Sequence, residues 1–318
     1  METENEILSI IIPIFNEEEN IPILLDEIDS VSREKNLNIM EIIFVNDGSM
    51  DRSEKVLKKI CKKNDKVTLI NFSKNFGQTA ALSAGFDKAK GNIIITMDGD
   101  LQNDPKDIPK LLERIDLGYD VVSGWRRRRK DKPITRVIPS RIANRLISTI
   151  SGIKLLDYGC TLKAYRKDYV KEIRLYGEMH RFIPIYVFWV GGKVSETEVH
   201  HRPRKFGQTK YGLNRTMKVI SDLIFLRFIN KYSMQPIHLF GRFGLLNFLL
   251  SFGTFFLMIY FKYWGGKSFI ETPLPQLVIL FFLVGILSLF MGFNAEVLMR
   301  TYYESQGKKT YRIRDIVD

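Results

Sequence analysis

Two long apolar segments near the carboxyl end constrain the fold of this chain more than any other feature. Phe243–Phe261 and Leu274–Ala295 carry no charged residue over about 19 and about 22 positions. A helix of that length crosses the ~30 Å hydrocarbon core of a bilayer, and two such segments in succession are unusual for buried core helices. Tyr260, Tyr263 and Trp264 stand where interfacial aromatic residues are expected. The sequence therefore predicts a two-helix transmembrane domain over residues 236–300.

Basic residues predict the orientation of the two spans. Lysines and arginines precede the first span and follow the second, whereas the connecting loop holds only Lys262 and Lys267. By the positive-inside tendency, both termini are expected in the cytoplasm, with the chain a multi-pass protein of the plasma membrane and residues 301–318 a cytoplasmic tail. Two cysteines, Cys61 and Cys160, are too few for a disulfide framework, which agrees with a reducing compartment.

The chain before the spans divides sharply by charge. Met1–Asp120 has 15 Lys and Arg against 23 Asp and Glu, a net charge of −8, whereas Val121–Gln235 has 25 against 8, a net charge of +17. Such a basic segment indicates an anionic partner, either nucleic acid, phosphate groups or an anionic lipid surface. The adjacent spans favour a lipid partner and no nucleic acid.

Two segments with basic flanks predict amphipathic helices on the membrane surface. Residues 137–151 and 213–235 each place apolar residues at helical spacing with lysine or arginine nearby. The alternative for each is an ordinary amphipathic helix packed on the soluble domain. We expect a soluble domain over residues 1–212, which includes the first helix, and a separate interfacial segment over 213–235.

Short β-rich apolar runs alternate with helical patterns in the soluble domain. The expected strands are Ile7–Ile14, Glu41–Asn46, Val67–Phe72, Asn92–Asp98 and Asp120–Ser123, and the expected helices are Glu17–Arg33, Asp51–Lys63, Gln78–Lys90 and Lys106–Leu117. This alternation predicts an α/β, Rossmann-like fold with a mostly parallel sheet and helices on both faces. In such sheets the ligand lies beyond the carboxyl ends of the strands.

Polar residues follow four of these strands, and the pair Asp98 and Asp100 carries the clearest chemistry. Two carboxylates one residue apart at the end of an apolar run favour a divalent cation, Mg²⁺ or Mn²⁺, which also binds diphosphate. Gln102 adds an amide oxygen. An acidic turn before a helix is the alternative for this motif taken alone. Neither a GxGxxG nor a GxxxxGK[ST] motif occurs in the chain, so nucleotide binding requires another type of binding motif.

A series of motifs resembles family 2 glycosyltransferases of the GT-A fold. The matching segments are IIPIFNEEENI, VNDGSMDRS, KNFGQTAALSAGFDKAKG, TMDGDLQNDP, DYGCTLKAYRKD and HRPRKFGQTKYG, and together they span most of Ile10–Gly212. Within the family the chain is similar to the polyprenyl-phosphate glycosyltransferases, which include dolichol-phosphate mannose synthases and bactoprenol glucosyltransferases. The resemblance implies that residues 1–212 form a GT-A catalytic domain.

The resemblance also implies roles for individual residues. The positions that match the donor nucleoside site are Pro13, Phe15, Glu17, Val45 and Asp47. Those that match the diphosphate and metal motif are Asp98, Gly99 and Asp100, with Gln102 as a further metal ligand. Those that face donor or acceptor phosphates are Arg126, Arg204 and Lys210. Asp157 matches the catalytic carboxylate of the family, and Arg126 is expected to be the second catalytic residue. An acceptor phosphate is largely dianionic at neutral pH, so Asp157 is expected to act either as a modest general base or by positioning other groups.

The predicted function is inverting transfer of glucose from UDP-glucose to undecaprenyl or a similar polyprenyl phosphate at the cytoplasmic leaflet. The same reaction with GDP-mannose or a UDP-amino-sugar is the alternative, followed by a non-catalytic, membrane-anchored nucleotide-sugar-binding protein. Because two spans offer little area to anchor the soluble domain, the sequence is compatible with a homo-oligomer.

Overall fold

The computed structural model describes residues 6–127, 144, 147–149, 151–171, 173, 175, 177–206, 228, 232 and 235–305. The chain separates into two compact units, residues 1–223 and 224–318. The expected helices over 137–151 and 213–235 lie largely outside the described residues, as do Lys210 and the tail beyond Ser305. The expected domain boundaries therefore stay predictions.

The first unit is built on a seven-stranded sheet with the order β3-β2-β1-β4-β6-β5-β7. Its strands are β1 (Leu8–Ile14), β2 (Ile39–Asn46), β3 (Val67–Asn71), β4 (Ile93–Thr96), β5 (Val121–Trp125), β6 (Lys163–Arg166) and β7 (Val194–Glu198). The five strands expected from the sequence are confirmed to within a few residues. Strands β1 to β4 run parallel to one another, as the strand–helix alternation predicted.

Strand β6 departs from the simple alternation. It lies antiparallel between β4 and β5, with Lys163 paired to Thr96 on one side and Ser123 on the other. The sequence gives little sign of this strand, because it is four residues long and begins and ends with a basic residue. Its insertion brings the loop that precedes it, residues 157–162, to the carboxyl end of β4.

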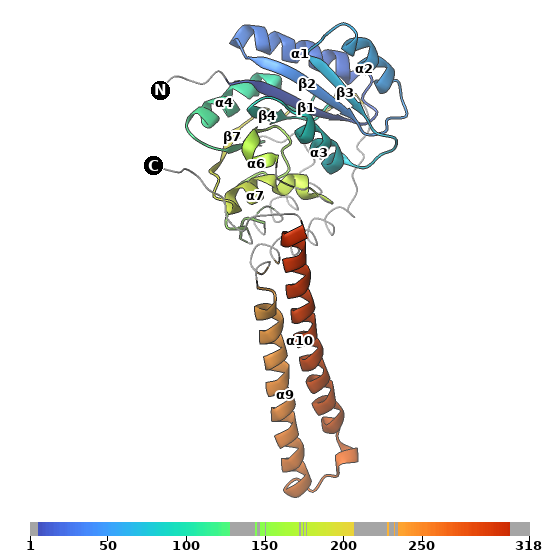
Figure 1. Cartoon of the computed structure of the whole chain (residues 1–318), viewed down its shortest axis with the longest axis vertical. Coiled ribbons are helices and arrows are strands. Elements are labelled where there is room, and N and C mark those ends of the chain that lie inside the picture. Colours follow the sequence, from blue (N-terminus) through green and yellow to red (C-terminus); the bar gives the residue numbers. More distant parts are fainter. Residues whose placement is uncertain are drawn as a thin grey trace. The chain divides into compact units, whose positions relative to one another are not determined.

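Helices cover both faces of the sheet (Figure 1). They are α1 (Asn20–Lys35), α2 (Ser53–Cys61), α3 (Gln78–Lys88), α4 (Ile108–Asp116) after the 3-10 turn η1 (Pro105–Asp107), α6 (Lys167–Val170), and α7 (Ile183–Trp189) after the 3-10 turn η3 (Met179–Phe182). The first four were expected from the sequence. Helix α1 begins later than predicted, two residues before Pro22, because proline is tolerated only in the first turn of a helix.

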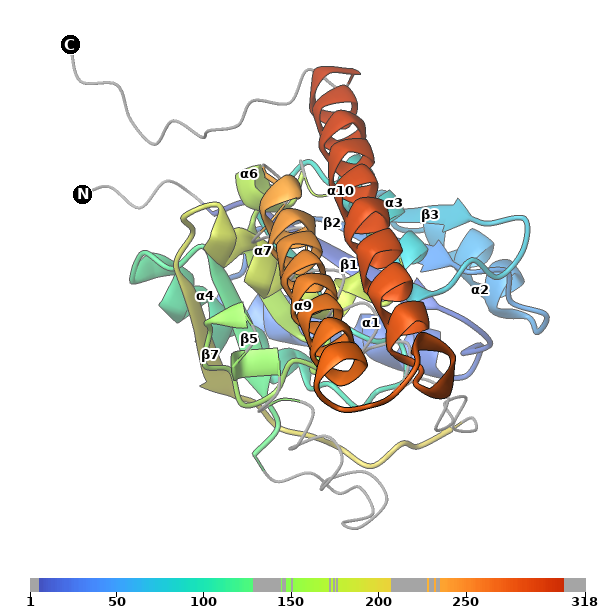
Figure 2. The same ribbon diagram turned by 90° about the horizontal axis from the view of Figure 1, so that it is seen from below.

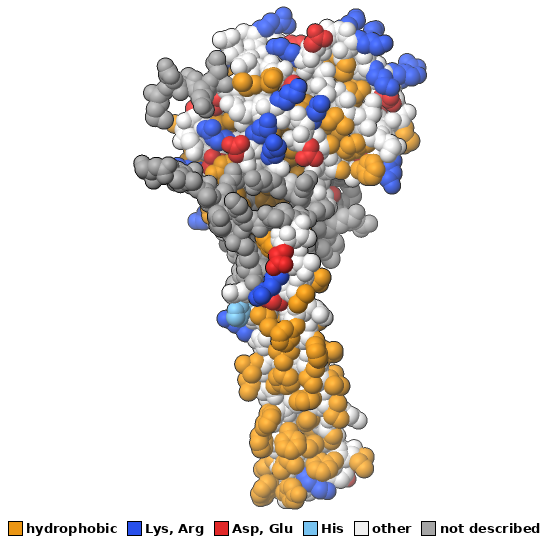
Figure 3. Space-filling view, in the orientation of Figure 1, with side chains coloured by type: hydrophobic (Ala, Val, Ile, Leu, Met, Phe, Trp, Pro, Cys, Tyr) orange, Lys and Arg blue, Asp and Glu red, His pale blue; other side chains and the backbone are white. Residues whose placement is uncertain are grey.

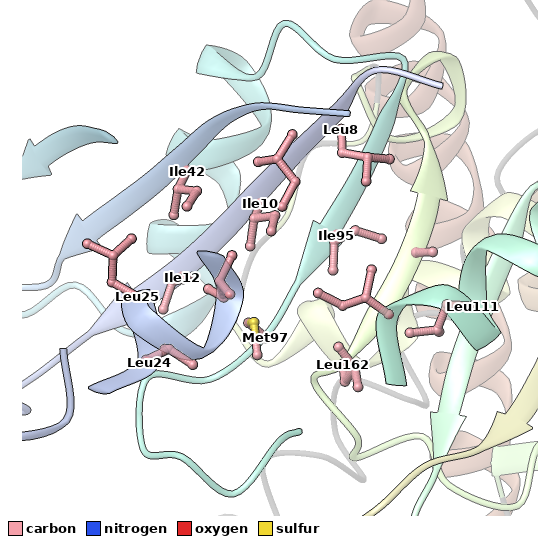
Figure 4. Close-up of a cluster of buried hydrophobic side chains, with 14 of the residues drawn as sticks. Leu8, Ile10, Ile12, Leu24, Leu25, Ile42, Ile95, Met97, Leu111 and Leu162 are labelled. Carbon is pink, nitrogen blue, oxygen red and sulfur yellow. The ribbon is translucent and has the colours of Figure 1, made fainter. Parts of the chain in front are cut away.

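The core of the sheet follows the alternation of side chains along β1. Ile10 and Ile12 point to the face covered by α1, where they join Leu24 in a fully buried cluster (Figure 4). Ile11 points to the other face and contacts α3, where the close packing leaves room only for the hydrogen of Gly85. A strand buried on both faces in this way requires helices on both sides.

The second unit is a helical hairpin of α9 (Ile237–Tyr263) and α10 (Leu274–Ser305), joined by a loop that contains the short turn η4 (Phe269–Glu271). The two helices lie side by side along their length (Figures 1 and 2). Gly285 packs against the ring of Phe248, and the Ser251 hydroxyl donates a hydrogen bond of 2.9 Å to the Val278 carbonyl. Small residues thus allow a close approach of the two backbones.

The outer surface of the hairpin is apolar (Figure 3). Helix α9 has 27 residues and α10 has 32, and both are long and apolar enough to cross a membrane. At about 1.5 Å per residue each exceeds the ~30 Å of a hydrocarbon core. Side chains such as Leu249 and Phe256 are more than half exposed, which is the pattern of a surface that contacts lipid.

Candidate active site

The loops after β1 and β2 are tied together by side chain to backbone hydrogen bonds. The Asn16 amide oxygen accepts from the Met50 N–H at 2.7 Å, and the Ser49 hydroxyl accepts from the Asn16 N–H at 2.9 Å. Asn16 has a φ of 56°, a left-handed conformation that asparagine adopts more readily than most residues. The polar residues that the sequence places after these two strands therefore build a single rim.

Asp47 fixes the next loop to this rim. Its two carboxylate oxygens accept hydrogen bonds from the backbone N–H groups of Phe76 (2.6 Å) and Gly77 (2.9 Å), just before α3. Burial raises the pKa of Asp47, and these two hydrogen bonds oppose the increase. The side chain predicted to bind a nucleoside thus also holds the loop after β3 in place.

The other residues predicted to bind the nucleoside lie on the same rim with different exposure. Pro13 and Phe15 are half-buried, whereas Glu17 is buried and accepts a 2.5 Å hydrogen bond from the Asn20 side chain. Val45 is fully buried in the sheet between β1 and β3. The structure brings all four to one edge, but the Val45 side chain packs in the core.

Asp98 lies directly beyond β4 and is held by two side chains. Its carboxylate accepts from the Gln78 amide and from the Thr161 hydroxyl, both at 2.7 Å. Burial, followed by the negative charge of Asp100, raises the pKa of Asp98 to about 6, whereas Thr161 and Arg126 oppose the increase. The aspartate is therefore oriented from α3 on one side and from the loop before β6 on the other.

Asp100 pairs with a basic residue from a distant part of the chain. The Arg204 guanidinium lies 2.6 Å from its carboxylate, and the Gln102 N–H donates to the same carboxylate at 3.1 Å. Between them Leu101 is buried with a φ of 60°, a conformation that costs a leucine about 1 kcal/mol or more. The hydrogen bonds of Asp98 and Asp100 and the burial of Leu101 hold this turn at the edge of the sheet, where the sequence predicted both aspartates and Gln102. Gly99 packs against Ile14, and its lack of a side chain allows this loop to lie close to β1.

The donor set at this edge fits a divalent cation. Two carboxylates and an amide side chain within five residues offer the hard oxygen ligands that Mg²⁺ and Mn²⁺ prefer. Burial, and next the charge of Asp100, raise the pKa of Asp98, and a cation would stabilise the ionised form that they disfavour. Among the described residues, no group of three or more His, Cys, Asp or Glu side chains is placed to hold a metal. A cation here would therefore take part of its coordination from phosphate oxygens or water.

Arg126 and Asp157 form a second charged pair beside this edge. The Arg126 guanidinium donates to both carboxylate oxygens of Asp157, at 2.8 and 3.1 Å, and the Gly159 N–H donates to the same carboxylate at 3.1 Å. The Asp157 side chain is 1% exposed and that of Arg126 is 18% exposed. Burial alone would lower the pKa of Arg126, but the Asp157 carboxylate raises it above its ordinary value. Arg126 thus keeps its charge in the pair, and it is the arginine that reaches solvent.

One short loop joins the two charged groups. Thr161, which donates to Asp98, lies four residues after Asp157 and just before β6. Together with Arg204, the structure therefore brings the predicted residues Asp98, Asp100, Arg126 and Asp157 to one end of the sheet. Lys210 lies outside the described residues.

Several residues of this region were not predicted from the sequence. Gln78 and Thr161 hold Asp98. Lys163 is 3% exposed, donates to the Tyr158 carbonyl at 3.2 Å, and has a pKa that burial lowers to about 8. Gln78, Thr161 and Lys163 lie inside the quoted motifs, so the signal was present. The contacts of Thr161 and Lys163 depend on the long-range insertion of β6, whereas Gln78 reaches Asp98 from the start of α3.

Comparison with known proteins places these features in a family. A model of the family described as Glycosyl transferase family 2 matches residues 9–174. The chain is 39% identical to a dodecaprenyl-phosphate galacturonate synthase of Rhizobium johnstonii, over 98% of this chain and 93% of the relative. It is 32% identical to an undecaprenyl-phosphate 4-deoxy-4-formamido-L-arabinose transferase of Shewanella sediminis, over 98% of this chain and 93% of the relative.

Solved structures with the same fold cover the first unit. A glucosyl-3-phosphoglycerate synthase of Mycobacterium tuberculosis, solved with Mn²⁺ and UDP, matches with a TM-score of 0.54 and 18% identity, over 70% of this chain and 80% of that one. The same enzyme solved with Mg²⁺ and UDP gives a TM-score of 0.53. These matches show the GT-A fold, with its mostly parallel sheet, to which this chain adds two long apolar helices. The chain therefore belongs to glycosyl transferase family 2, as a polyprenyl-phosphate glycosyltransferase.

Proposed function

We propose that this enzyme transfers a glycosyl residue, with inversion, from a nucleoside diphosphate sugar to the phosphate of a polyprenyl phosphate at the cytoplasmic leaflet. The observation that carries the proposal is the contact of one loop with both charged groups. Asp157 of this loop pairs with Arg126, while Thr161 of the same loop binds Asp98. A cation-binding edge and an arginine that reaches solvent are thus held in a fixed relation by five residues of chain.

The first charged group suits the leaving diphosphate of the donor. Negative charge develops on that diphosphate as the bond to the sugar breaks, and a bound Mg²⁺ or Mn²⁺ would stabilise it as a Lewis acid. Asp98 and Asp100, with Gln102, would hold the cation. Arg204 lies 2.6 Å from Asp100 and is placed to neutralise charge at the same edge.

The second charged group suits the acceptor phosphate. Arg126 presents a planar guanidinium, which binds phosphate oxygens with two hydrogen bonds, and its bidentate pairing with Asp157 fixes that plane. Both oxygens of Asp157 accept hydrogen bonds and its side chain is almost fully buried. We therefore infer that Asp157 positions Arg126, while the dianionic acceptor needs little help from a general base.

The sugar is proposed from the relatives. Glucose is the sugar predicted from the sequence, but the relative with 39% identity is named for galacturonate and the relative with 32% identity for 4-deoxy-4-formamido-L-arabinose. Galacturonate is accordingly the first sugar that we propose, ahead of glucose. A UDP-linked donor is retained from the sequence prediction.

Membrane attachment through α9 and α10 gives the enzyme access to a lipid acceptor. The helices are long and apolar enough to span the bilayer. We propose the orientation predicted from the basic residues, with the first unit in the cytoplasm and the loop around Lys267 outside.

A donor screen tests the proposal. The full chain in lipid nanodiscs is incubated with Mg²⁺, undecaprenyl phosphate and, in separate reactions, UDP-galacturonate, UDP-glucose, UDP-4-deoxy-4-formamido-L-arabinose and GDP-mannose. The lipid products are identified by mass spectrometry. Product from UDP-galacturonate at the highest kcat/KM supports the proposal. If another donor gives the highest kcat/KM, its sugar replaces galacturonate in the proposal. If no donor gives a lipid product, the proposed function is rejected.

A further inference from the structure

We infer that Arg181 is a further substrate-binding residue, which together with Arg126 holds a phosphoryl group in the space above Gly159. Arg181 belongs to the turn η3 and none of the motifs in the sequence analysis contains it. The inference rests on the proposed function, because that reaction brings a phosphoryl group to Arg126.

The geometry around Gly159 carries the inference. A Cβ atom built on Gly159 would lie 3.4 Å from Arg126 Nη2, 3.6 Å from Asp157 Oδ1 and 4.0 Å from Arg181 Nη1. These are ordinary contact distances, so a methyl group fits at Gly159 without displacing its neighbours. Two guanidinium groups from distant parts of the chain, one after β5 and one in η3, therefore border the same space.

Exposure shows which of these groups an incoming ligand can reach. The side chains of Arg126 and Arg181 are 18% and 26% exposed, whereas the Asp157 side chain is 1% exposed. An anion that approaches from solvent thus meets the two arginines before the carboxylate. The Glu178 carboxylate, 3.8 Å from Arg181, is 25% exposed, so it is at the Arg126 end of the space that an accessible guanidinium covers a buried carboxylate.

Basic side chains from three parts of the chain gather around this space. Among the described residues, Arg126, Arg181 and the buried Lys163 lie near the carboxylate of Asp157, and Glu178 pairs with Arg181 at 3.8 Å. The carboxylates of Asp98 and Glu196 act on the same cluster. The partly exposed guanidinium groups, rather than the net charge, therefore supply the contacts for an anion.

A phosphoryl group suits two guanidinium groups better than a ligand that offers a single carboxylate oxygen. Each guanidinium can donate two parallel hydrogen bonds, and a phosphoryl group offers three oxygens in different directions. The proposed reaction contains two sources of this chemistry, the monoester of the lipid acceptor and the diphosphate of the donor. The experiment separates them.

The test uses the full chain in nanodiscs with the variants Arg181→Gln, Arg181→Lys and Gly159→Ala. Arg33→Gln is the matched control, because Arg33 is an exposed arginine of α1 whose side chain donates to the Asp29 carbonyl of the same helix. Titrations with farnesyl phosphate, with farnesol and with UDP measure binding without need of the correct sugar. The KM values for undecaprenyl phosphate and for the donor are measured where the wild type shows turnover.

We expect Arg181→Gln to weaken the binding of farnesyl phosphate by about 10- to 100-fold, the loss expected for a hydrogen bond between charged groups, and to leave farnesol unaffected. Arg181→Lys should recover part of the loss. Gly159→Ala should fold normally, because its backbone lies outside the left-handed region and its Cβ has room, and should weaken the same ligand by filling the space. If Arg181→Gln does not fold, the other two variants carry the test.

The outcomes distinguish the sources and the alternatives. Weaker farnesyl phosphate binding together with a higher KM for the lipid assigns the group to the acceptor, and weaker UDP binding with a higher KM for the donor assigns it to the diphosphate. Unchanged binding of both ligands in all three variants overturns the inference. A defect that appears only with uronate donors also overturns it, since Arg181 would then bind a sugar carboxylate. Absence of turnover in the wild type would reject the proposed function but not the binding result.

Discussion

At the scale of single residues, the structure defines Asp157 by its pairing. Its carboxylate receives three hydrogen bonds from Arg126, two from the guanidinium and one from the backbone N–H, and one from the Gly159 N–H, and it is shielded from solvent. A carboxylate in this environment orients a guanidinium, and it has little access to a substrate proton. The family position of Asp157 was found from the sequence, but its partner could be seen only in the fold.

The variant Asp157→Asn tests this positioning role. Asparagine offers one acceptor oxygen where Asp157 offers two, so one of the two guanidinium donors of Arg126 faces an NH2 group and the guanidinium loses its fixed plane. We expect kcat to fall by about 100-fold or more. UDP binding should stay within about twofold of the wild type, since charge-assisted contacts to the diphosphate are unchanged. Glu198→Gln is the control, because Glu198 forms an exposed pair with the neighbouring Arg127 at 3.4 Å. Near-normal turnover of Asp157→Asn would remove Asp157 from the mechanism.

The raised pKa of Asp98 predicts how metal binding depends on pH. Burial, and next the charge of Asp100, place this pKa at about 6, and only the ionised carboxylate binds a cation. The apparent affinity for Mn²⁺ should therefore fall as the pH is lowered through about 6, by at most about tenfold per pH unit for one proton. Isothermal titration between pH 5 and pH 8 would measure it, and a flat profile would contradict the prediction.

Unfolding should not account for that loss of metal binding. The pKa of Asp98 is higher in the folded chain than its ordinary value of 3.8, so its ionisation disfavours the folded state. The contribution of this group to stability is thus present at acidic pH and is lost as the pH rises from about 4 to about 6. A thermal melt at each pH serves as the control.

At the scale of elements, the loops at the carboxyl ends of the strands are built to support one another. Gly48 has a φ of 69°, and a Cβ on this residue would lie 2.6 Å from Asn75 N in the backbone of the neighbouring loop. That neighbouring loop is the one that Asp47 holds through Phe76 and Gly77. The rim therefore depends on the absence of a side chain at Gly48.

We expect Gly48→Ala to destabilise the protein by about 2–4 kcal/mol and to weaken UDP binding, because both the backbone conformation and the contact with the next loop are lost. Gly118→Ala separates the two effects. Gly118 has a φ of 86° with nothing within 4 Å of its Cβ, so its substitution introduces the conformational strain alone, about 1 kcal/mol. Equal destabilisation of the two variants, measured by chemical unfolding, would contradict the proposed contact.

The elements also show what could be predicted from the sequence. Strands such as β1 and β2 are long, apolar and followed by helical patterns, so their positions and their parallel pairing were predicted correctly. Strand β6 was missed, since it is short and places the charged Lys163 in the middle of the sheet. The contact of Thr161 follows from that strand and its loop, that of Gln78 joins α3 to the end of β4, and Arg181 lies in η3, so no local pattern predicts them. Asp98 and Asp100 were predicted as site residues because their spacing at a strand end is itself a local signal.

At the scale of the whole molecule, the hairpin of α9 and α10 predicts a defined topology. Lys267 in the connecting loop should face the outside, and Met50, which is 87% exposed in the first unit, should face the cytoplasm. In a Cys61→Ser background, Lys267→Cys should react with a membrane-impermeant maleimide in intact cells, and Met50→Cys only after permeabilisation. The reverse labelling pattern would contradict the orientation.

The account as a whole depends on Asp98 and Asp100 acting on the donor beside the arginine that binds the acceptor. Mass spectrometry of the lipid formed by the full chain from undecaprenyl phosphate and its preferred nucleotide sugar tests this most directly. We predict a polyprenyl-phosphate sugar that forms with Mg²⁺ or Mn²⁺, disappears with EDTA, and is lost in Asp98→Asn while Arg33→Gln retains wild-type activity. Undiminished product in Asp98→Asn, or with the divalent cation removed, would contradict the account.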